Sequence, residues 1–204
     1  MKKWLCFVLA TLMLLCVGCG SEEQEKASAS PSASSNVPVP NPDLKVEDCY
    51  TFTENRDGTY SYTVEWRGGG VIFRADNEIR PASFAVISED VLMISGQAGT
   101  GVTARWAIFC DIERGRVSEA FGQYLAAVDG HVAFLDYRTD QYHVFVCDPF
   151  TPHEYTQVVT LDDWVMSDDV IKNFALSEES LLLVTYATAD GDKTVTVALN
   201  ATEE

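Results

Sequence analysis

Three histidines, His131, His143 and His153, are the first candidates for chemistry, because imidazole nitrogens bind zinc and exchange protons near neutral pH. Their spacing forms neither an H-x-x-x-H nor an H-E-x-x-H motif. His131 and His143 could face one another across a hairpin. However, His143 lies between Tyr142 and Val144 on an alternating strand, where an ordinary histidine on the polar face is the simpler interpretation. The pattern therefore predicts no metal site.

Carboxylates are abundant, with 31 Asp and Glu residues, but they form no recognisable motif. The densest cluster could bind calcium, yet it lacks the D-x-[DN]-x-[DN]-G spacing of a calcium loop and is better explained as a solvated loop. Its members are Asp162, Asp163, Asp168 and Asp169. No G-x-S-x-G elbow or phosphate-binding loop occurs, and no carboxylate pair is singled out as a glycosidase would require. We expect no catalytic residue and no cofactor.

The cysteines downstream of the N-terminal segment are Cys49, Cys110 and Cys147, an odd number, so at least one has no partner within the chain. Cys110 and Cys147 occupy similar sequence contexts and could be neighbours. Free buried thiols are the preferred interpretation, because equivalent positions on adjacent units point the same way without needing to touch. No motif supplies the base that a cysteine nucleophile needs.

The N-terminus has the pattern of a secretory signal. Lys2 and Lys3 precede an apolar run from Trp4 to Val17 that is interrupted only by Thr11. This run is too short to cross a bilayer comfortably but long enough for the core of a signal peptide.

The residues "VGC" that follow resemble the lipobox of bacterial lipoproteins, in which a diacylglycerol is attached to the cysteine and the preceding segment is removed. The resemblance implies that residues 1–18 form a lipoprotein signal peptide and that Cys19 is lipidated. The chain departs from the usual pattern at Cys16, where leucine is normal, with Leu15 one place too early. The alternative is a plain cleaved signal that leaves Cys19 free.

Residues 19–43 are rich in serine and proline and poor in large apolar side chains. Such a segment cannot bury enough apolar surface to offset its ordering entropy, so we expect a disordered tether after the lipidated cysteine. The formal charge is −17, and it becomes −19 once Lys2 and Lys3 are removed with the signal. This negative field argues against nucleic acid as a partner.

Residues 44–204 are predicted to form a single β-rich domain. The run "YSYTVEW" places Tyr60, Tyr62, Val64 and Trp66 on one face, the period of a half-buried strand. Four hairpins are expected, around "NRDG", "ERGR", "RTDQ" and "ADGDK". The only helical candidate is "SDDVIKNF", where Ser167 or Asp168 could cap one or two turns.

An acidic turn followed by an apolar strand recurs in "SEDVLMI", "VDGHVAFL" and "SEESLLLV", and two of the units end in Cys110-Asp111 and Cys147-Asp148. This rhythm is typical of propeller blades. The predicted fold is therefore all-β, an antiparallel hairpin meander with propeller-like blades or a sandwich.

The succession "DGTYSYTV", "RPASFAVISEDVLMIS", "GTG", "FCDIERGRVSEAF" and "VDGHVAFLDY", with a closing hairpin, resembles a group of uncharacterised lipoproteins of gut-dwelling Firmicutes. The resemblance covers most of residues 58–199. It implies a location at the outer face of the cell membrane and a β-rich domain, and it carries no catalytic residues over to this chain.

We expect a membrane-anchored, non-catalytic binding module whose ligand is a cell-surface protein or glycan. The candidate ligand contacts are Tyr137, Tyr142 and Trp164, which lie near strand ends, whereas Trp66 and Trp106 are expected in the core. A cell-surface hydrolase acting on glycan or peptide is the alternative. A solute-binding protein with two α/β lobes is disfavoured because βαβ patterning is absent from the sequence.

Overall fold

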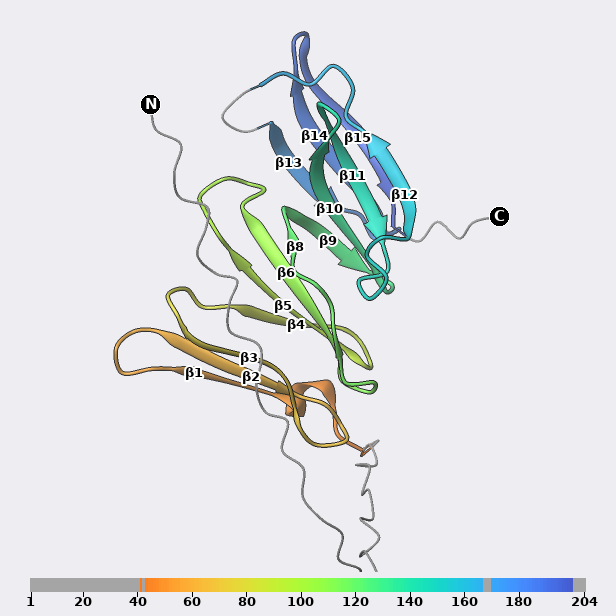
Figure 1. Ribbon diagram of the computed structural model, residues 1–204. Helices are drawn as coiled ribbons and strands as arrows, with labels where there is room; N and C mark the ends of the chain where they lie inside the picture. Colours follow the sequence, from red (N-terminus) through yellow and green to blue (C-terminus); the bar gives the residue numbers. More distant parts are fainter. Residues whose placement is uncertain (1–40, 42, 167–169, 200–204) are drawn as a thin grey trace, which may run out of the picture. The chain divides into compact units, whose positions relative to one another are not determined.

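The computed structural model describes residues 41, 43–166 and 170–199, which all lie within one compact unit, Val37–Glu204 (Figure 1). These residues form strands, turns and one short 3-10 helix, η1 (Val46–Cys49), with no α-helix among them. The all-β prediction is confirmed. The predicted signal peptide, Cys19 and nearly all of the tether lie outside the described residues.

In the described ranges, fifteen strands form four antiparallel sheets, which we name A to D in chain order. Sheet A contains β1 (Tyr50–Glu54), β2 (Tyr60–Glu65) and β3 (Val71–Glu78). Sheet B contains β4 (Ser83–Ser88), β5 (Val91–Gln97), β6 (Arg105–Asp111), β7 (Arg116–Val117) and β8 (Phe121–Gly122). Sheet C contains β9 (Tyr124–Val128), β10 (His131–Arg138), β11 (Gln141–Cys147) and β12 (Tyr155–Thr160). Sheet D contains β13 (Ile171–Leu176), β14 (Leu181–Thr188) and β15 (Gly191–Ala198).

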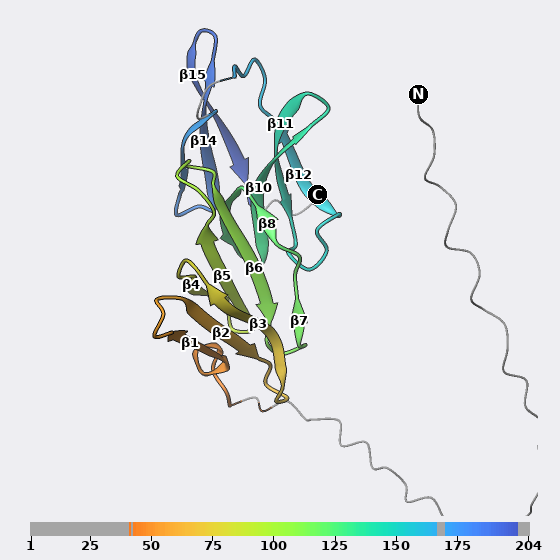
Figure 2. The same cartoon turned by 60° about the vertical axis from the view of Figure 1, so that its left-hand side comes forward.

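In sheets A, C and D, strands that follow one another in the chain also pair with one another, and sheet B follows the same meander from β4 to β7. The short strands β7 and β8 both pair with β6 (Figure 2). The repeat expected from the sequence is present. Cys110 pairs with Leu92, the second residue of β5, and Cys147 pairs with Val132, the second residue of β10.

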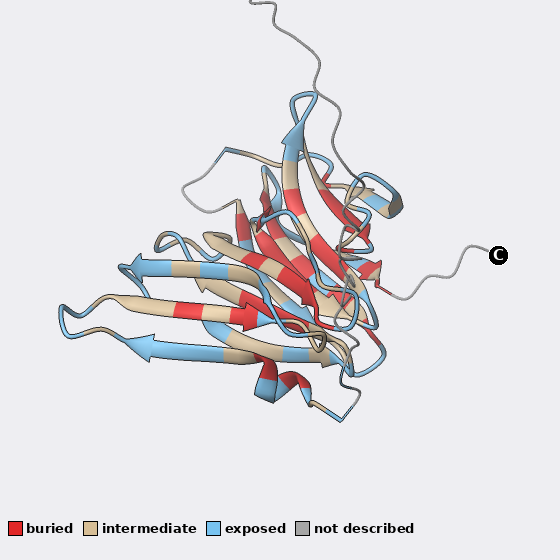
Figure 3. Cartoon of the chain, turned by 60° about the horizontal axis from the view of Figure 1, so that its bottom comes forward, coloured by how far each residue is buried: buried red, intermediate tan, exposed pale blue. Residues whose placement is uncertain are grey.

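Each sheet packs against the next one in chain order. Tyr62 and Val64 of sheet A join Leu92 and Ile94 of sheet B in one core cluster. A second cluster joins sheets B and C, and a third joins sheets C and D. Strand β5 shows the consequence, because Met93 faces sheet C while its neighbours face sheet A. Sheets B and C are therefore packed against another sheet on both faces. Figure 3 shows the buried residues in red where the sheets pack against one another.

The two terminal sheets have polar outer faces. Thr51, Thr53 and Arg74 are exposed on the face of sheet A that points away from the core. Thr194 and Thr196 occupy the corresponding face of sheet D. No core cluster of the described residues joins sheet A to sheet D. The described sheets thus form an open stack, and Leu183, which is opposite Thr196 and 39% exposed, is an apolar side chain on the outer face of sheet D.

The helical prediction for "SDDVIKNF" is wrong over its described part, since Ile171–Leu176 forms strand β13. Phe174 pairs with Val184 of β14, and Ile171 is buried in the core between sheets C and D. Pairing with β14 therefore outweighs the local capping signal. Ser167 and Asp168, the proposed caps, lie outside the described residues.

Candidate functional site

The three predicted ligand contacts lie together in one aromatic cluster. Tyr137 and Tyr142 are directly opposite one another on β10 and β11, with ring centroids 4.9 Å apart. Trp164 follows β12 and contacts both rings edge-on, at 5.8 Å from Tyr137 and 4.9 Å from Tyr142. Perpendicular ring pairs of this kind are favourable beyond the area they bury.

The tight turn between β10 and β11 aligns the two tyrosines. Arg138 pairs with Gln141, which leaves Thr139 and Asp140 as a two-residue loop. Both residues have positive φ, 49° and 64°, as a type I′ hairpin turn requires. A left-handed conformation is uncommon for a β-branched residue such as Thr139. The turn keeps the rings in cross-strand register.

Trp164 is held by sheet D rather than by sheet C. It forms an isolated β-bridge with Thr188, and the Val165 N–H donates to the Ala187 carbonyl at 3.1 Å. The Tyr186 hydroxyl donates to the Asp162 carbonyl at 3.1 Å. The cluster thus forms where two sheets meet: sheet D fixes the backbone at Trp164, and the β10–β11 hairpin fixes the two tyrosines.

The aromatic cluster is partly open to solvent and has acidic neighbours. Tyr137 is 46% exposed, whereas Tyr142 and Trp164 are half-buried against the core between sheets C and D. Asp140 and Asp163 are exposed beside it along the chain. The guanidinium of Arg138 does not extend over these rings, because its Nε donates to Asp136 at 2.6 Å and its Cζ lies 4.5 Å from the Phe145 ring centroid.

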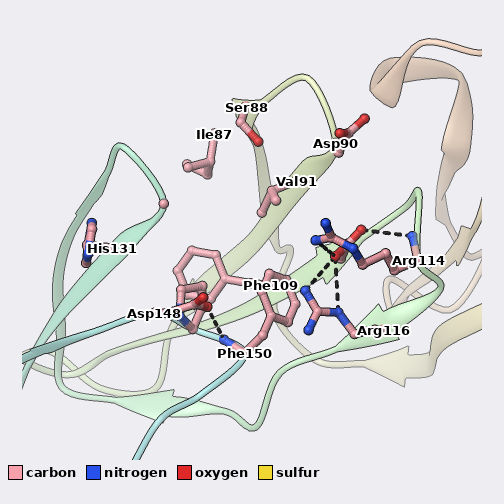
Figure 4. Close-up of a pocket in the computed structure, with 13 residues that line it drawn as sticks. Ile87, Ser88, Asp90, Val91, Phe109, Arg114, Arg116, His131, Asp148 and Phe150 are labelled. Carbon is pink, nitrogen blue, oxygen red and sulfur yellow. Dashed lines mark hydrogen bonds and ion pairs between the residues drawn. The ribbon is translucent and has the colours of Figure 1, made fainter. Parts of the chain in front are cut away.

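A polar cavity of about 210 Å³ lies between sheets B and C, at the end where β5 and β10 begin (Figure 4). Its lining combines acidic, basic and apolar side chains. Among them are Ile87, Phe109, Asp111, Arg116, His131 and Phe150. No sequence pattern indicated this cavity, because its walls come from two separate sheets.

Asp111 is the buried charge at this cavity, with only 2% of its surface exposed. The Arg114 N–H donates to Oδ1 at 2.9 Å, and the guanidinium groups of Arg116 and Arg114 lie 2.8 and 3.3 Å from Oδ2 (Figure 4). Burial would raise the pKa of Asp111, but these N–H groups and positive charges outweigh it, and the pKa is lowered. The carboxylate is therefore ionised, and both of its oxygens are bound by Arg114 and Arg116, which follow it closely in the chain.

The Asp111 network was missed in the sequence, where "ERGR" was interpreted only as a hairpin turn. The signal was present, since "CDIERGR" places two arginines within five residues of an aspartate. Arg116 also lies over the Phe150 ring, with 4.5 Å between Cζ and the ring centroid. These contacts attach the turn after β6 to the loop after β11.

The histidines do not converge. His143 pairs with Asp136, five residues along β10 from His131, so the two histidines do not face one another across the hairpin, in agreement with the simpler interpretation of the sequence. His131 Nδ1 lies 3.1 Å from the Asp129 carbonyl oxygen, and His143 Nδ1 lies 3.0 Å from Thr160 Oγ1. His153 is exposed in the loop between β11 and β12. Within the described ranges, no group of three His, Cys, Asp or Glu residues is arranged to hold a metal ion.

Cys49, Cys110 and Cys147 are free and buried, as the sequence predicted. Cys110 packs between sheets A and B, whereas Cys147 packs between sheets B and C, which explains why these two similar positions do not pair. Burial raises the pKa of both thiols to about 12. A thiol with so little thiolate at neutral pH is a poor nucleophile.

The remaining candidates have ordinary surroundings. Asp162 and Asp163 are exposed, while Asp168 and Asp169 lie outside the described residues. Trp66 and Trp106 are half-buried rather than fully enclosed. Trp106 packs against the core between sheets A and B, and Trp66 lies over the turn glycines Gly68 and Gly115.

Comparisons with protein-family models, with curated proteins and with solved structures return no significant match to this chain. Within the residues that the structure describes, no helix is long and apolar enough to cross a membrane.

Proposed function

We propose that this chain is a membrane-anchored extracytoplasmic lipoprotein whose β domain is a non-catalytic binding module. The lipid on Cys19 anchors it, and the residues up to position 43 hold the domain away from the membrane surface. The aromatic cluster of Tyr137, Tyr142 and Trp164 is the contact surface. Its ligand is a glycan or a protein of the cell surface.

The observation that carries this proposal is the convergence of the three aromatic side chains. Tyrosine and tryptophan supply large contact areas with few rotatable bonds, so they bind at a low entropic cost when their positions are already fixed. The hairpin turn and the bridge between Trp164 and Thr188 supply that fixation. Exposed aromatic faces can stack on a sugar ring or an apolar peptide side chain.

A hydrolase acting on glycan or peptide is the second candidate, with the cavity of Figure 4 as its site. Asp90, Asp111, Asp148 and His131 line this cavity. A general acid needs a raised pKa, whereas that of Asp111 is lowered by the arginines that bind it. The aromatic cluster therefore has the better-supported role.

The test uses the full-length protein and bacterial cell-wall sacculi, before and after removal of attached proteins. Replacing Tyr137, Tyr142 and Trp164 together by alanine should lower the fraction of the protein that stays bound to the sacculi at least tenfold. The matched control is Phe52→Ala, since Phe52 is 43% exposed, close to the 46% of Tyr137, but lies on sheet A. Tyr137→Ala alone should also weaken binding while leaving the unfolding temperature almost unchanged.

If the triple variant, the control and the wild-type protein bind the sacculi equally, the proposal that the aromatic cluster is the contact surface is contradicted. Turnover of the sacculi by the purified protein, abolished by Asp148→Asn or His131→Gln, would favour the hydrolase instead. Loss of retention after protein removal would identify a protein rather than a glycan as the ligand.

A further inference from the structure

A second polar groove, of about 440 Å³, lies at the opposite end of β5 and β6 from the cavity of Figure 4. Its side chains come from β4, β5, β6 and the segment before β4. They are Arg80, Pro81, Ser83, Ser95, Gln97 and Arg105. No carboxylate lines this groove, although the chain as a whole has a net charge of −17.

Strand register gathers the donors of this groove on one face of sheet B. Arg105 is directly opposite Gln97, and Ser83 is directly opposite Ser95. Ser95 and Gln97 are two residues apart, so their side chains share a face. This is the face that carries Met93 into the core between sheets B and C. The groove is thus the polar continuation of that core.

Arg105 is fixed in position by two aromatic rings. Its Cζ lies 4.9 Å from the ring centroid of Tyr124 and 5.3 Å from that of Phe174. Such stacking uses the face of the guanidinium and leaves its N–H edge available. Within the described part of the chain, no carboxylate forms an ion pair with Arg105.

Arg80 approaches the same groove from the loop before β4. Its Nη1 donates to the Gln97 carbonyl at 3.0 Å, so both arginines meet at Gln97. Arg80 likewise has no ion-pair partner among the described residues. By contrast, five other arginines each pair with an aspartate. These are Arg67, Arg74, Arg114, Arg116 and Arg138.

We propose that this groove binds an oxyanion of an extracellular ligand, either a carboxylate or a phosphate ester. Arg105 provides a pre-oriented guanidinium fork, and Arg80 adds a second positive charge. The hydroxyls of Ser83 and Ser95 and the amide of Gln97 can donate further hydrogen bonds. Arginine forks match the geometry of both oxyanions and form hydrogen bonds stronger than neutral ones. This site is separate from the aromatic cluster and does not depend on it.

The experiment titrates the full-length protein in detergent with two probe pairs, followed by amide chemical shifts. One pair is an N-acetylated dipeptide with a free C-terminal carboxylate and its C-terminal amide. The other pair is glycerol 3-phosphate and glycerol. Saturable shifts at residues 80, 82, 83, 95–97 and 105 are expected with at least one anionic probe. Neither neutral partner should produce them, and the anion that binds more tightly identifies the source of the oxyanion.

Arg105→Gln and Arg80→Gln should each weaken binding at least tenfold. Arg56→Gln is the matched control, since Arg56 also has no ion pair among the described residues but lies in the β1–β2 turn. Because Arg105 also packs between two rings, Arg80→Gln separates loss of binding from loss of folding. The proposal is overturned if neither anion binds saturably, or if binding persists in both groove variants. An equal loss in the Arg56 variant would also overturn it.

Discussion

Arg116 Nη2 lies 2.8 Å from Asp111 Oδ2, and the Asp111 side chain is almost completely buried. A buried carboxylate is stable only where hydrogen bonds and opposite charges replace its lost hydration. The Arg114 N–H and both neighbouring guanidinium groups provide that replacement here. The contact therefore connects the end of β6 to the start of β7, where Asp111 and Arg116 are directly paired.

The first prediction concerns acid stability. Because the folded-state pKa of Asp111 is lowered, its ionised form stabilises the fold above its unfolded pKa of about 3.9. This contribution is lost as the pH falls through the lower folded pKa. Asp111→Asn should reduce the free energy of unfolding by about 1–3 kcal/mol at neutral pH. Urea denaturation should show that the difference in unfolding free energy between this variant and the wild-type protein shrinks as the pH falls below about 3.9.

Asp148→Asn is the control for this experiment. Asp148 follows Cys147 as Asp111 follows Cys110, but it is exposed and only accepts the Phe150 N–H at 2.7 Å. An asparagine oxygen can still accept that hydrogen bond, so we expect a change within about 0.5 kcal/mol. A pH-independent difference for Asp111→Asn would show that packing, rather than charge, accounts for its effect.

The second prediction concerns thiol reactivity. Burial raises the pKa of Cys110 and Cys147 to about 12, so at about pH 8 each is almost entirely protonated as well as shielded. Iodoacetamide should leave both residues unmodified in the folded protein and label both in guanidinium chloride. Peptide mass spectrometry identifies the labelled residues. Rapid labelling of either thiol under native conditions would show that the sheet packing around it opens.

The third prediction tests the close packing of β5 against β6. A Cβ on Gly96 would lie 2.6 Å from Trp106 Cζ2, well inside van der Waals contact. Gly96→Ala should therefore cost about 1–3 kcal/mol, because the indole ring must move within a packed face. Gly122→Ala provides the comparison, since a Cβ there meets no atom within 4 Å. Thermal unfolding of both variants should show a lower midpoint only for Gly96→Ala.

Features set by neighbouring residues were predictable from the sequence. The alternation in "YSYTVEW" predicted β2, and its inward residues Tyr62 and Val64 are buried. The "RTDQ" turn predicted the pairing of β10 with β11, which brings Tyr137 and Tyr142 together. Turn chemistry and period-2 patterns act over a few residues, so they can be read without knowing the tertiary structure.

Features set by contacts between sheets were not predictable in the same way. Strand β6 is buried on both faces, because Ala107 and Phe109 pack against sheet C while Cys110 packs against sheet A. The position of Trp164 depends on its bridge to Thr188, and the groove around Arg105 depends on pairing with Gln97. These relationships join residues far apart in the chain, and no local pattern specifies them.

The last prediction concerns the anchor. If Cys19 carries the lipid, Cys19→Ala should move the protein out of the membrane fraction, and the acylated N-terminal peptide should disappear from mass spectra. Cys16→Leu is the matched control, because it removes a nearby cysteine and restores the residue that is usual in a lipobox. That variant should remain acylated and membrane-bound. If the wild-type protein is soluble and has a free thiol at Cys19, the prediction of a lipid anchor is contradicted. It would leave the proposal for the aromatic cluster standing for a secreted protein, because the cluster is formed by β10, β11 and the segment after β12.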